Sequence, residues 1–214
     1  MKEIDLLIFD FDGTLVSTST DLANAVNYTL EQLGFRLKQE DEIISFVGDG
    51  VKKLIERALG ADHLNCYPEA IKIFTGHYSK HLLDNTTLCP GAEEILKYFQ
   101  HKKKVILTNK RYDFTRAISK GLDIEKYFVE IVGDGTLPYK KPDKRLVDYL
   151  SEKYSTEKVK TVIIGDGIND ITLAKNSGIL SCAYLNGLGK PEVLLAANAD
   201  YYCKNLSEIS SLFC

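Results

Sequence analysis

The stretch LLIFDFDGTLV, residues 6–16, is an apolar run that ends at two aspartates with one residue between them and then breaks into Gly-Thr. The run is apolar at consecutive positions, which is typical of a strand buried on both faces of a parallel sheet. Asp10 and Asp12 would then stand at the carboxyl end of that strand. Ligands of open α/β sheets bind outside this edge, so the two carboxylates mark a predicted site.

Length and charge limit the possible classes of protein. The chain has 214 residues, 44% of them hydrophobic, and a net charge of −3. This length suffices for one sizeable core and a smaller second one, and the weak negative charge predicts no nucleic-acid or membrane-surface partner. No stretch reaches the ~18 apolar residues of a membrane span, and a strand follows Met1 almost at once. We therefore expect a cytoplasmic protein without a signal peptide.

Cysteine and histidine usage gives no metal or disulfide signal. The five cysteines are scattered without CxxC spacing, so we expect reduced thiols. His77 and His81 have helical spacing suited to a metal, but no acidic or cysteine partner is near in sequence. We interpret the pair as a solvated helix face.

Short apolar runs alternate with helical patterns along most of the chain. Runs rich in β-branched residues, typical of buried parallel strands, lie at residues 4–10, 104–109, 129–133, 161–166 and 180–185. Helical patterns lie between the later runs, at residues 91–100, 111–122, 143–154 and 169–178, the third expected to start near Pro142. This alternation predicts an α/β fold with a doubly wound, Rossmann-like parallel sheet.

One connection is too long for an ordinary crossover. Between residues 17 and 88 no convincing strand occurs, and helical stretches are expected at residues 20–34, 49–60 and 68–83. We predict an inserted all-helical cap domain at residues 17–86, and a core domain made of residues 1–16 and 87–214. The hinges are expected around residues 16–20 and 84–90.

Four separate segments bring polar groups to the predicted edge of the sheet. Asp10 and Asp12 follow the first strand, Thr108-Asn109 the second and Asp166 the fourth, while Lys141 lies in a loop. Carboxylates held close together need a cation between them, and ligand sets made only of oxygen suit a hard ion. With few protein ligands, so that phosphate and water complete the shell, Mg²⁺ is the expected cofactor.

This set of groups suits phosphoryl transfer. Asp10 is the candidate nucleophile, forming an aspartyl phosphate, and Asp12 the candidate acid and base. Gly13 permits the sharp turn that points amides at an anion. The candidate donors to the phosphoryl oxygens are Thr108, Asn109 and Lys141. Taken singly, each of these residues could be a turn, a helix cap or a solvated side chain; only their combination favours catalysis.

The combination resembles the four motifs of haloacid dehalogenase-like hydrolases. The matching stretches are DFDGT at 10–14, Thr108, Lys141 before Pro142, and GDGIND at 165–170. The resemblance implies that Mg²⁺ is held by Asp10, the backbone carbonyl of Asp12, and Asp166. It also implies that Thr14 belongs to the phosphate site and that Asn169 and Asp170 support the metal ligands.

Further stretches resemble one branch of that family, the bacterial phosphoglycolate phosphatases. They are TDLANAVNYTLEQLG, FVGDGVKKLIERALG, TNK at 108–110 and DGTLPYKKPD. This likeness implies that cap residues face the site and bind substrate, namely Gly48, Gly50, Lys52 or Lys53, and Arg57. The expected partner is a small-molecule phosphate ester, with 2-phosphoglycolate preferred, and the expected assembly is a monomer or homodimer.

Other readings remain open at this point. A sugar-phosphate phosphatase or mutase, or a pyrophosphatase, would use the same scaffold, although Gly165 replaces the acid that such mutases usually carry. A phospho-receiver signalling module also uses an aspartate, Mg²⁺, a threonine and a lysine, but it is shorter and has no cap. A catalytically silent binding protein is disfavoured by the complete acidic set.

Overall fold

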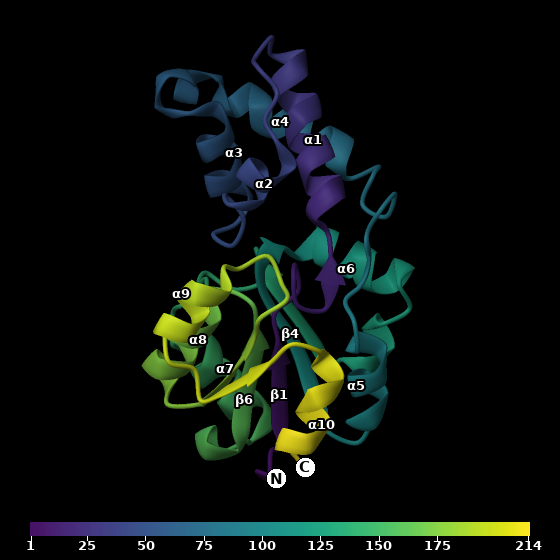
Figure 1. Ribbon diagram of the computed structural model, residues 1–214, viewed down its shortest axis with the longest axis vertical. Helices are drawn as coiled ribbons and strands as arrows, with labels where there is room; N and C mark the ends of the chain where they lie inside the picture. Colours follow the sequence, from purple (N-terminus) through teal and green to yellow (C-terminus); the bar gives the residue numbers. More distant parts are fainter.

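The computed structural model, which describes residues 1–214, has one parallel sheet with helices on both sides (Figure 1). Its six strands have the order β5-β4-β1-β6-β7-β8. They are β1 (Leu6–Phe9), β4 (Lys103–Arg111), β5 (Glu130–Asp134), β6 (Thr161–Gly165), β7 (Leu180–Tyr184) and β8 (Tyr201–Cys203). Every neighbouring pair is parallel, which confirms the predicted α/β class.

The central strand β1 is buried on both faces. Leu7 and Phe9 pack into one hydrophobic cluster, and Leu6 and Ile8 pack into another. The helices of the sheet layer are α5 (Ala92–Tyr98), α6 (Tyr112–Gly121), α7 (Arg145–Tyr154), α8 (Ile168–Ser177), α9 (Pro191–Ala196) and α10 (Ile209–Leu212). Short 3₁₀ turns are η2 (Glu125–Tyr127), η3 (Lys158–Lys160) and η4 (Leu206–Glu208). None of the helices is long and apolar enough to cross a membrane.

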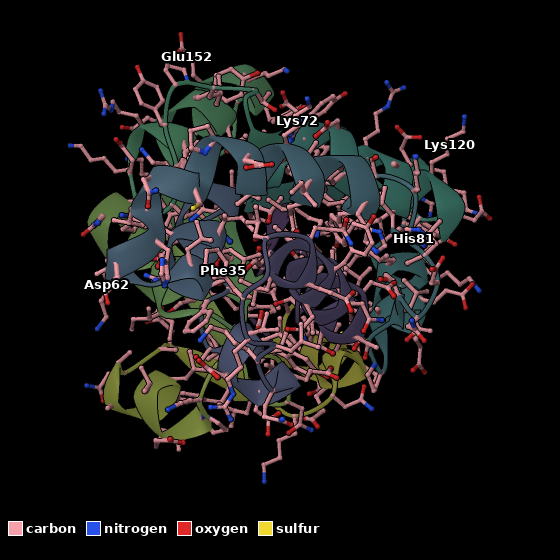
Figure 2. The ribbon with its side chains drawn as sticks, turned by 90° about the horizontal axis from the view of Figure 1, so that it is seen from above. Phe35, Asp62, Lys72, His81, Lys120 and Glu152 are labelled. Carbon is pink, nitrogen blue, oxygen red and sulfur yellow. The ribbon has the colours of Figure 1, made fainter.

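The long connection after β1 forms a helical segment above the carboxyl end of the sheet (Figures 1 and 2). Its elements are α1 (Ser19–Gln32), α2 (Glu40–Ile44), α3 (Val51–Leu59), η1 (Ala61–Cys66) and α4 (Tyr67–Tyr78). Helix α1 packs against α2, α3 and α4. Leu54 and Phe74 of this segment belong to the same apolar cluster as Phe9 of the sheet. The segment is therefore seated on the core by hydrophobic contact.

The chain enters and leaves the helical segment through a small antiparallel ribbon. Strands β2 (Val16–Ser17) and β3 (Thr87–Leu88) pair with each other, although no strand was expected between residues 17 and 88. Strands of two residues are too short to show a period in the sequence. Next to the ribbon, the carboxylate of Asp21 accepts hydrogen bonds from the backbone N–H groups of Asn85 and Thr86 and from both of their side chains, at 2.7–3.0 Å.

We expect Asp21→Asn to destabilise the fold by about 1–3 kcal/mol, because the amide replaces a buried carboxylate that accepts charge-assisted bonds. Burial acts to raise the pKa of Asp21, but the hydrogen bonds from Asn85 and Thr86 lower it below 3.8. The stabilisation is therefore present above pH 3.8 and is lost as the pH falls through the folded-state value. Urea unfolding at pH 7 and pH 3 measures the difference, with the exposed Asp84→Asn as control. An equal loss of unfolding free energy for Asp21→Asn at both pH values would contradict this prediction.

Several element boundaries differ from those predicted. Strand β4 continues to Arg111, so that Thr108 and Asn109 lie within it and not after it. Helix α7 begins at Arg145 and not near Pro142, because Asp143 Oδ1 first accepts the Arg145 N–H in a turn. Helix α4 ends at Tyr78, short of the predicted residue 83, and three-residue β8 was missed.

Candidate active site

A tight turn after β1 brings Asp10 and Asp12 to the edge of the sheet. Phe11 and Leu15 are fully buried and anchor this loop. Gly13 adopts φ +81°, and a Cβ there would lie 2.3 Å from Asp166 Oδ2. The glycine is thus required both by the turn and by the close approach of a carboxylate from another strand.

Lys141 joins two of the predicted acidic residues. Its Nζ lies 2.7 Å from Asp10 Oδ1 and 2.6 Å from Asp170 Oδ1. The Lys141 side chain is only 2% exposed. Burial disfavours the ammonium, but the carboxylates of Asp10 and Asp170 outweigh it and raise the pKa of Lys141. The site therefore holds a permanent positive charge beside Asp10.

Asp10 uses its two carboxylate oxygens differently. Oδ1 forms the ion pair with Lys141 Nζ and accepts a hydrogen bond from the Phe11 N–H, each at 2.7 Å. No protein donor reaches Oδ2. The carboxylate is held in a fixed orientation by one oxygen, and the other oxygen stays available for chemistry.

Asp166 is buried at the end of β6 beneath a loop that sequence reasoning missed. Thr14 Oγ1 donates to its Oδ1 at 2.6 Å, and the backbone N–H groups of Leu188 and Gly189 donate to Oδ2 at 2.7 and 3.2 Å. Burial and the neighbouring charge of Asp10 nevertheless raise the pKa of Asp166 to about 6. A Cβ on Gly187 would lie 2.3 Å from Asp166, so this loop needs glycine there. The sequence could have indicated that this loop belongs to the site, because the loop follows the carboxyl end of β7, and ligands bind at that end of parallel strands.

Asp12 contacts two residues that were not predicted from the sequence to be its partners. Its Oδ1 accepts hydrogen bonds from Thr18 Oγ1 at 2.7 Å and from Lys110 Nζ at 3.0 Å. Lys110 Nζ also donates to Tyr78 Oη at 2.7 Å. Asp12 is thus connected both to the entry of α1 and to the end of α4.

Asn109 fixes the main chain around the site. Its side chain accepts the Lys141 N–H at 2.9 Å and donates to the Lys141 carbonyl at 3.2 Å and the Gly48 carbonyl at 3.0 Å. The Thr108 hydroxyl accepts the Lys110 N–H at 3.1 Å. The amide of Asn109, which we expected to contact phosphate, is therefore engaged by backbone groups in this structure.

The helical segment places some of its predicted substrate-binding residues beside the site, but not all of them. The Gly48 carbonyl also accepts from Asn169 Nδ2 at 3.2 Å, and Asn169 donates to Asp49 Oδ1 at 3.0 Å. Arg57 pairs with Asp49 and donates to the Phe46 carbonyl at 2.9 Å. Lys53 pairs with Glu56 at 2.8 Å on an exposed surface, away from the aspartates.

Two cavities meet at the aspartates, and Asp10 and Asp12 line both. The larger, of about 540 Å³, is also lined by Asp166, Asn169 and Arg57. The smaller, of about 60 Å³, is lined by apolar side chains of the helical segment, among them Leu54, Phe74 and Tyr78, and also by Gly50, Thr108, Lys110 and Lys141. The predicted site thus opens between the sheet and the helical segment.

Comparison with known proteins places this arrangement in a family. The model of the haloacid dehalogenase-like hydrolases matches residues 7–184, which contain every motif described above. The chain belongs to the haloacid dehalogenase-like hydrolase family. This membership confirms the resemblance inferred from the four motifs and identifies the chain as a hydrolase.

Relatives in this family are similar over nearly the whole chain. A phosphoglycolate phosphatase of Vibrio parahaemolyticus is 30% identical over 97% of this chain and 95% of its own length. A phosphoglycolate phosphatase of Colwellia psychrerythraea is 35% identical over 87% of each.

Solved structures of the family share the fold. A haloacid dehalogenase-like hydrolase of Streptococcus pneumoniae superposes with a TM-score of 0.87 at 26% identity over 98% of both chains. A predicted phosphoglycolate phosphatase of Haemophilus somnus reaches a TM-score of 0.92 at 24% identity over 99% of both chains. The arrangement of sheet and helical segment is therefore that of other family members.

Proposed function

We propose that this hydrolase is a Mg²⁺-dependent phosphatase that hydrolyses a small phosphate ester, preferentially 2-phosphoglycolate, through an aspartyl phosphate on Asp10. The observation that carries the proposal is the Asp10 carboxylate at the end of β1, held through Oδ1 by Lys141 and Phe11 with Oδ2 free. The names of the relatives from Vibrio and Colwellia support the substrate.

Asp10 acts as the nucleophile in the first half of the reaction. Its free oxygen attacks phosphorus, the bond from phosphorus to the ester oxygen breaks, and Asp12 gives its proton to the departing alkoxide. The buried ammonium of Lys141 stabilises negative charge on Asp10 and the phosphoryl oxygens without any rearrangement.

Asp12 acts as the base in the second half. It takes a proton from water, the water oxygen attacks phosphorus, and the bond between phosphorus and Asp10 breaks. Inorganic phosphate leaves, and both carboxyl groups return to their starting states. Asp12 thus serves first as the acid and then as the base, so its carboxyl group must keep the same position in both steps.

The residues present fit a magnesium ion. Burial and the neighbouring charge of Asp10 raise the pKa of Asp166, so the two carboxylates lie close enough for their charges to repel each other. The Asp12 carbonyl accepts no hydrogen bond from the protein. Two carboxylates and one backbone carbonyl are few protein ligands, which suits an ion that keeps water and phosphate in its shell. Asp10, Asp166 and the Asp12 carbonyl would hold Mg²⁺, which would neutralise charge between Asp10 and the phosphate.

Residues 17–86 are proposed as a cap that opens and closes over the site, with hinges at residues 16–20 and 84–90. The β2–β3 ribbon and the Asp21 hydrogen bonds lie at these two crossings. Closure would exclude water from the aspartates, as in other enzymes with mobile covers. Gly48, Gly50 and Arg57 would then face the substrate, whereas the position of Lys53 does not support its predicted role.

The substrate is tested by kcat/KM over a panel of phosphate esters with Mg²⁺: 2-phosphoglycolate, hexose phosphates, nucleotides and pyrophosphate. We expect a preference of about 100-fold or more for 2-phosphoglycolate, equivalent to about 2.7 kcal/mol of transition-state binding. Arg57→Ala should reduce that preference, because Arg57 lines the larger cavity. Arg145→Ala, an exposed arginine paired with Asp143, is the control. A flat profile, or a preference for a hexose phosphate or pyrophosphate, would contradict the proposed substrate.

A further inference from the structure

Lys110 carries a buried ammonium that the catalytic motifs do not explain. It lies near the end of β4, and its side chain is 5% exposed. Nζ bonds Asp12 Oδ1 on one side and Tyr78 Oη on the other, and lies 4.8 Å from the centroid of the Tyr78 ring. A buried ammonium is costly unless it is paired and hydrogen-bonded, so both partners are needed to keep it there.

Tyr78 is held firmly at the last turn of α4. Its ring is 1% exposed, stacks on Phe74 at 5.3 Å and meets Phe114 of α6 edge-on at 5.1 Å. Burial raises the pKa of Tyr78 to about 12, so its hydroxyl stays neutral and accepts the Lys110 hydrogen bond. Lys110 therefore joins the carboxylate of Asp12 to an aromatic cluster that α4 of the helical segment forms with Phe114 of α6.

The backbone of β4 is shaped to deliver this lysine. The register between β4 and β5 shifts between Leu107 and Arg111, and Thr108, Asn109 and Lys110 all line the smaller cavity. A regular strand would turn alternate side chains away, whereas an irregularity re-aims them. The partner strand accommodates the shift with Gly133, where a Cβ would lie 2.9 Å from the Lys110 carbonyl.

We propose that Lys110 is a positioning residue that orients the Asp12 carboxylate for proton transfer, with Tyr78 as its anchor on the helical segment. The inference rests on the proposed function, in which Asp12 protonates the leaving oxygen. Two of the three ammonium donors of Lys110 are already engaged, by Asp12 and Tyr78, which favours this role over direct binding of the substrate. Proton transfer would then depend on the helical segment being seated on the core.

The test compares two substrates that differ in their need for a proton. An alkyl phosphate such as 2-phosphoglycolate expels a basic alkoxide, whereas p-nitrophenyl phosphate expels a stable phenolate. In single turnovers with excess enzyme, Lys110→Met should slow cleavage of the alkyl ester by about 10²-fold or more, and that of p-nitrophenyl phosphate by less than ~3-fold. Tyr78→Phe, which keeps the ring, should show the same selectivity with a smaller loss of about 10-fold.

Matched variants separate this inference from the function on which it rests. Lys104→Met removes another buried lysine of β4, one bound only to the carbonyls of Phe99 and Lys102, and should leave both rates unchanged. Asp12→Asn should show the selective loss. If Asp12→Asn is selective but Lys110→Met slows both esters equally or neither, the positioning role is wrong. If Asp12→Asn is not selective, the proposed role of Asp12 fails, and the inference fails with it.

Discussion

Asp10→Asn should lower kcat by about 10⁴-fold or more, because the amide cannot form the covalent phosphoryl intermediate. The substitution changes no volume in the site. Lys141 keeps its 2.6 Å contact with Asp170, so its ammonium remains paired when the charge of Asp10 is lost. The expected result is a folded, inactive protein, measured by steady-state kinetics and by urea unfolding of the same preparation.

Asp123→Asn is the matched control for this variant. Asp123 pairs with Lys126 on the surface, outside the catalytic motifs in sequence, and its replacement should leave kcat within ~2-fold of the parent value. A folded Asp10→Asn enzyme with near-normal kcat would show that Asp10 is not the nucleophile.

Lys141→Met should destabilise the fold by about 3–5 kcal/mol, because it removes the shared cation of two acidic side chains. Asp170 is 3% exposed and would keep only its hydrogen bond from the Gly167 N–H at 3.1 Å. Asp10 would lose the 2.7 Å contact that orients it. Urea unfolding in the absence of Mg²⁺ measures the change in free energy of unfolding without a contribution from bound metal.

Lys158→Met provides the comparison for this prediction. Lys158 pairs with Asp148 at 2.6 Å, but both side chains are more than 40% exposed, so the pair should contribute less than about 1 kcal/mol. A loss for Lys141→Met no larger than that for Lys158→Met would mean that the buried cation does not hold the acidic cluster together.

The sheet and the acidic site were predictable because their signals are local. The run 6–9 followed by Asp10 and Asp12 combines a buried strand with carboxylates at its end, and the parallel-sheet rule then places Asp166 and Lys141 beside them. The structure brings these four residues together. Applying this rule to a sequence requires only the order of the strands along the chain and no knowledge of side-chain contacts.

Contacts between distant segments could not be predicted in this way. Lys110 follows Asn109 at the end of an apolar run, and nothing in its sequence neighbourhood shows that Tyr78 shields it. The ribbon β2–β3 depends on pairing between distant residues, Val16 with Leu88, 72 positions apart, and Ser17 with Thr87, 70 positions apart. The sequence also gives no sign that Arg57 pairs with Asp49, as it does in the structure.

The most direct test of the account is to locate the phosphoryl group on the enzyme. The protein is quenched with acid during turnover, reduced with borohydride, which converts an aspartyl phosphate to homoserine, and sequenced by tandem mass spectrometry. We predict homoserine at position 10 and none at Asp12, Asp166 or Asp170. Turnover without any modified aspartate, or homoserine at another of these positions, would contradict the covalent mechanism through Asp10.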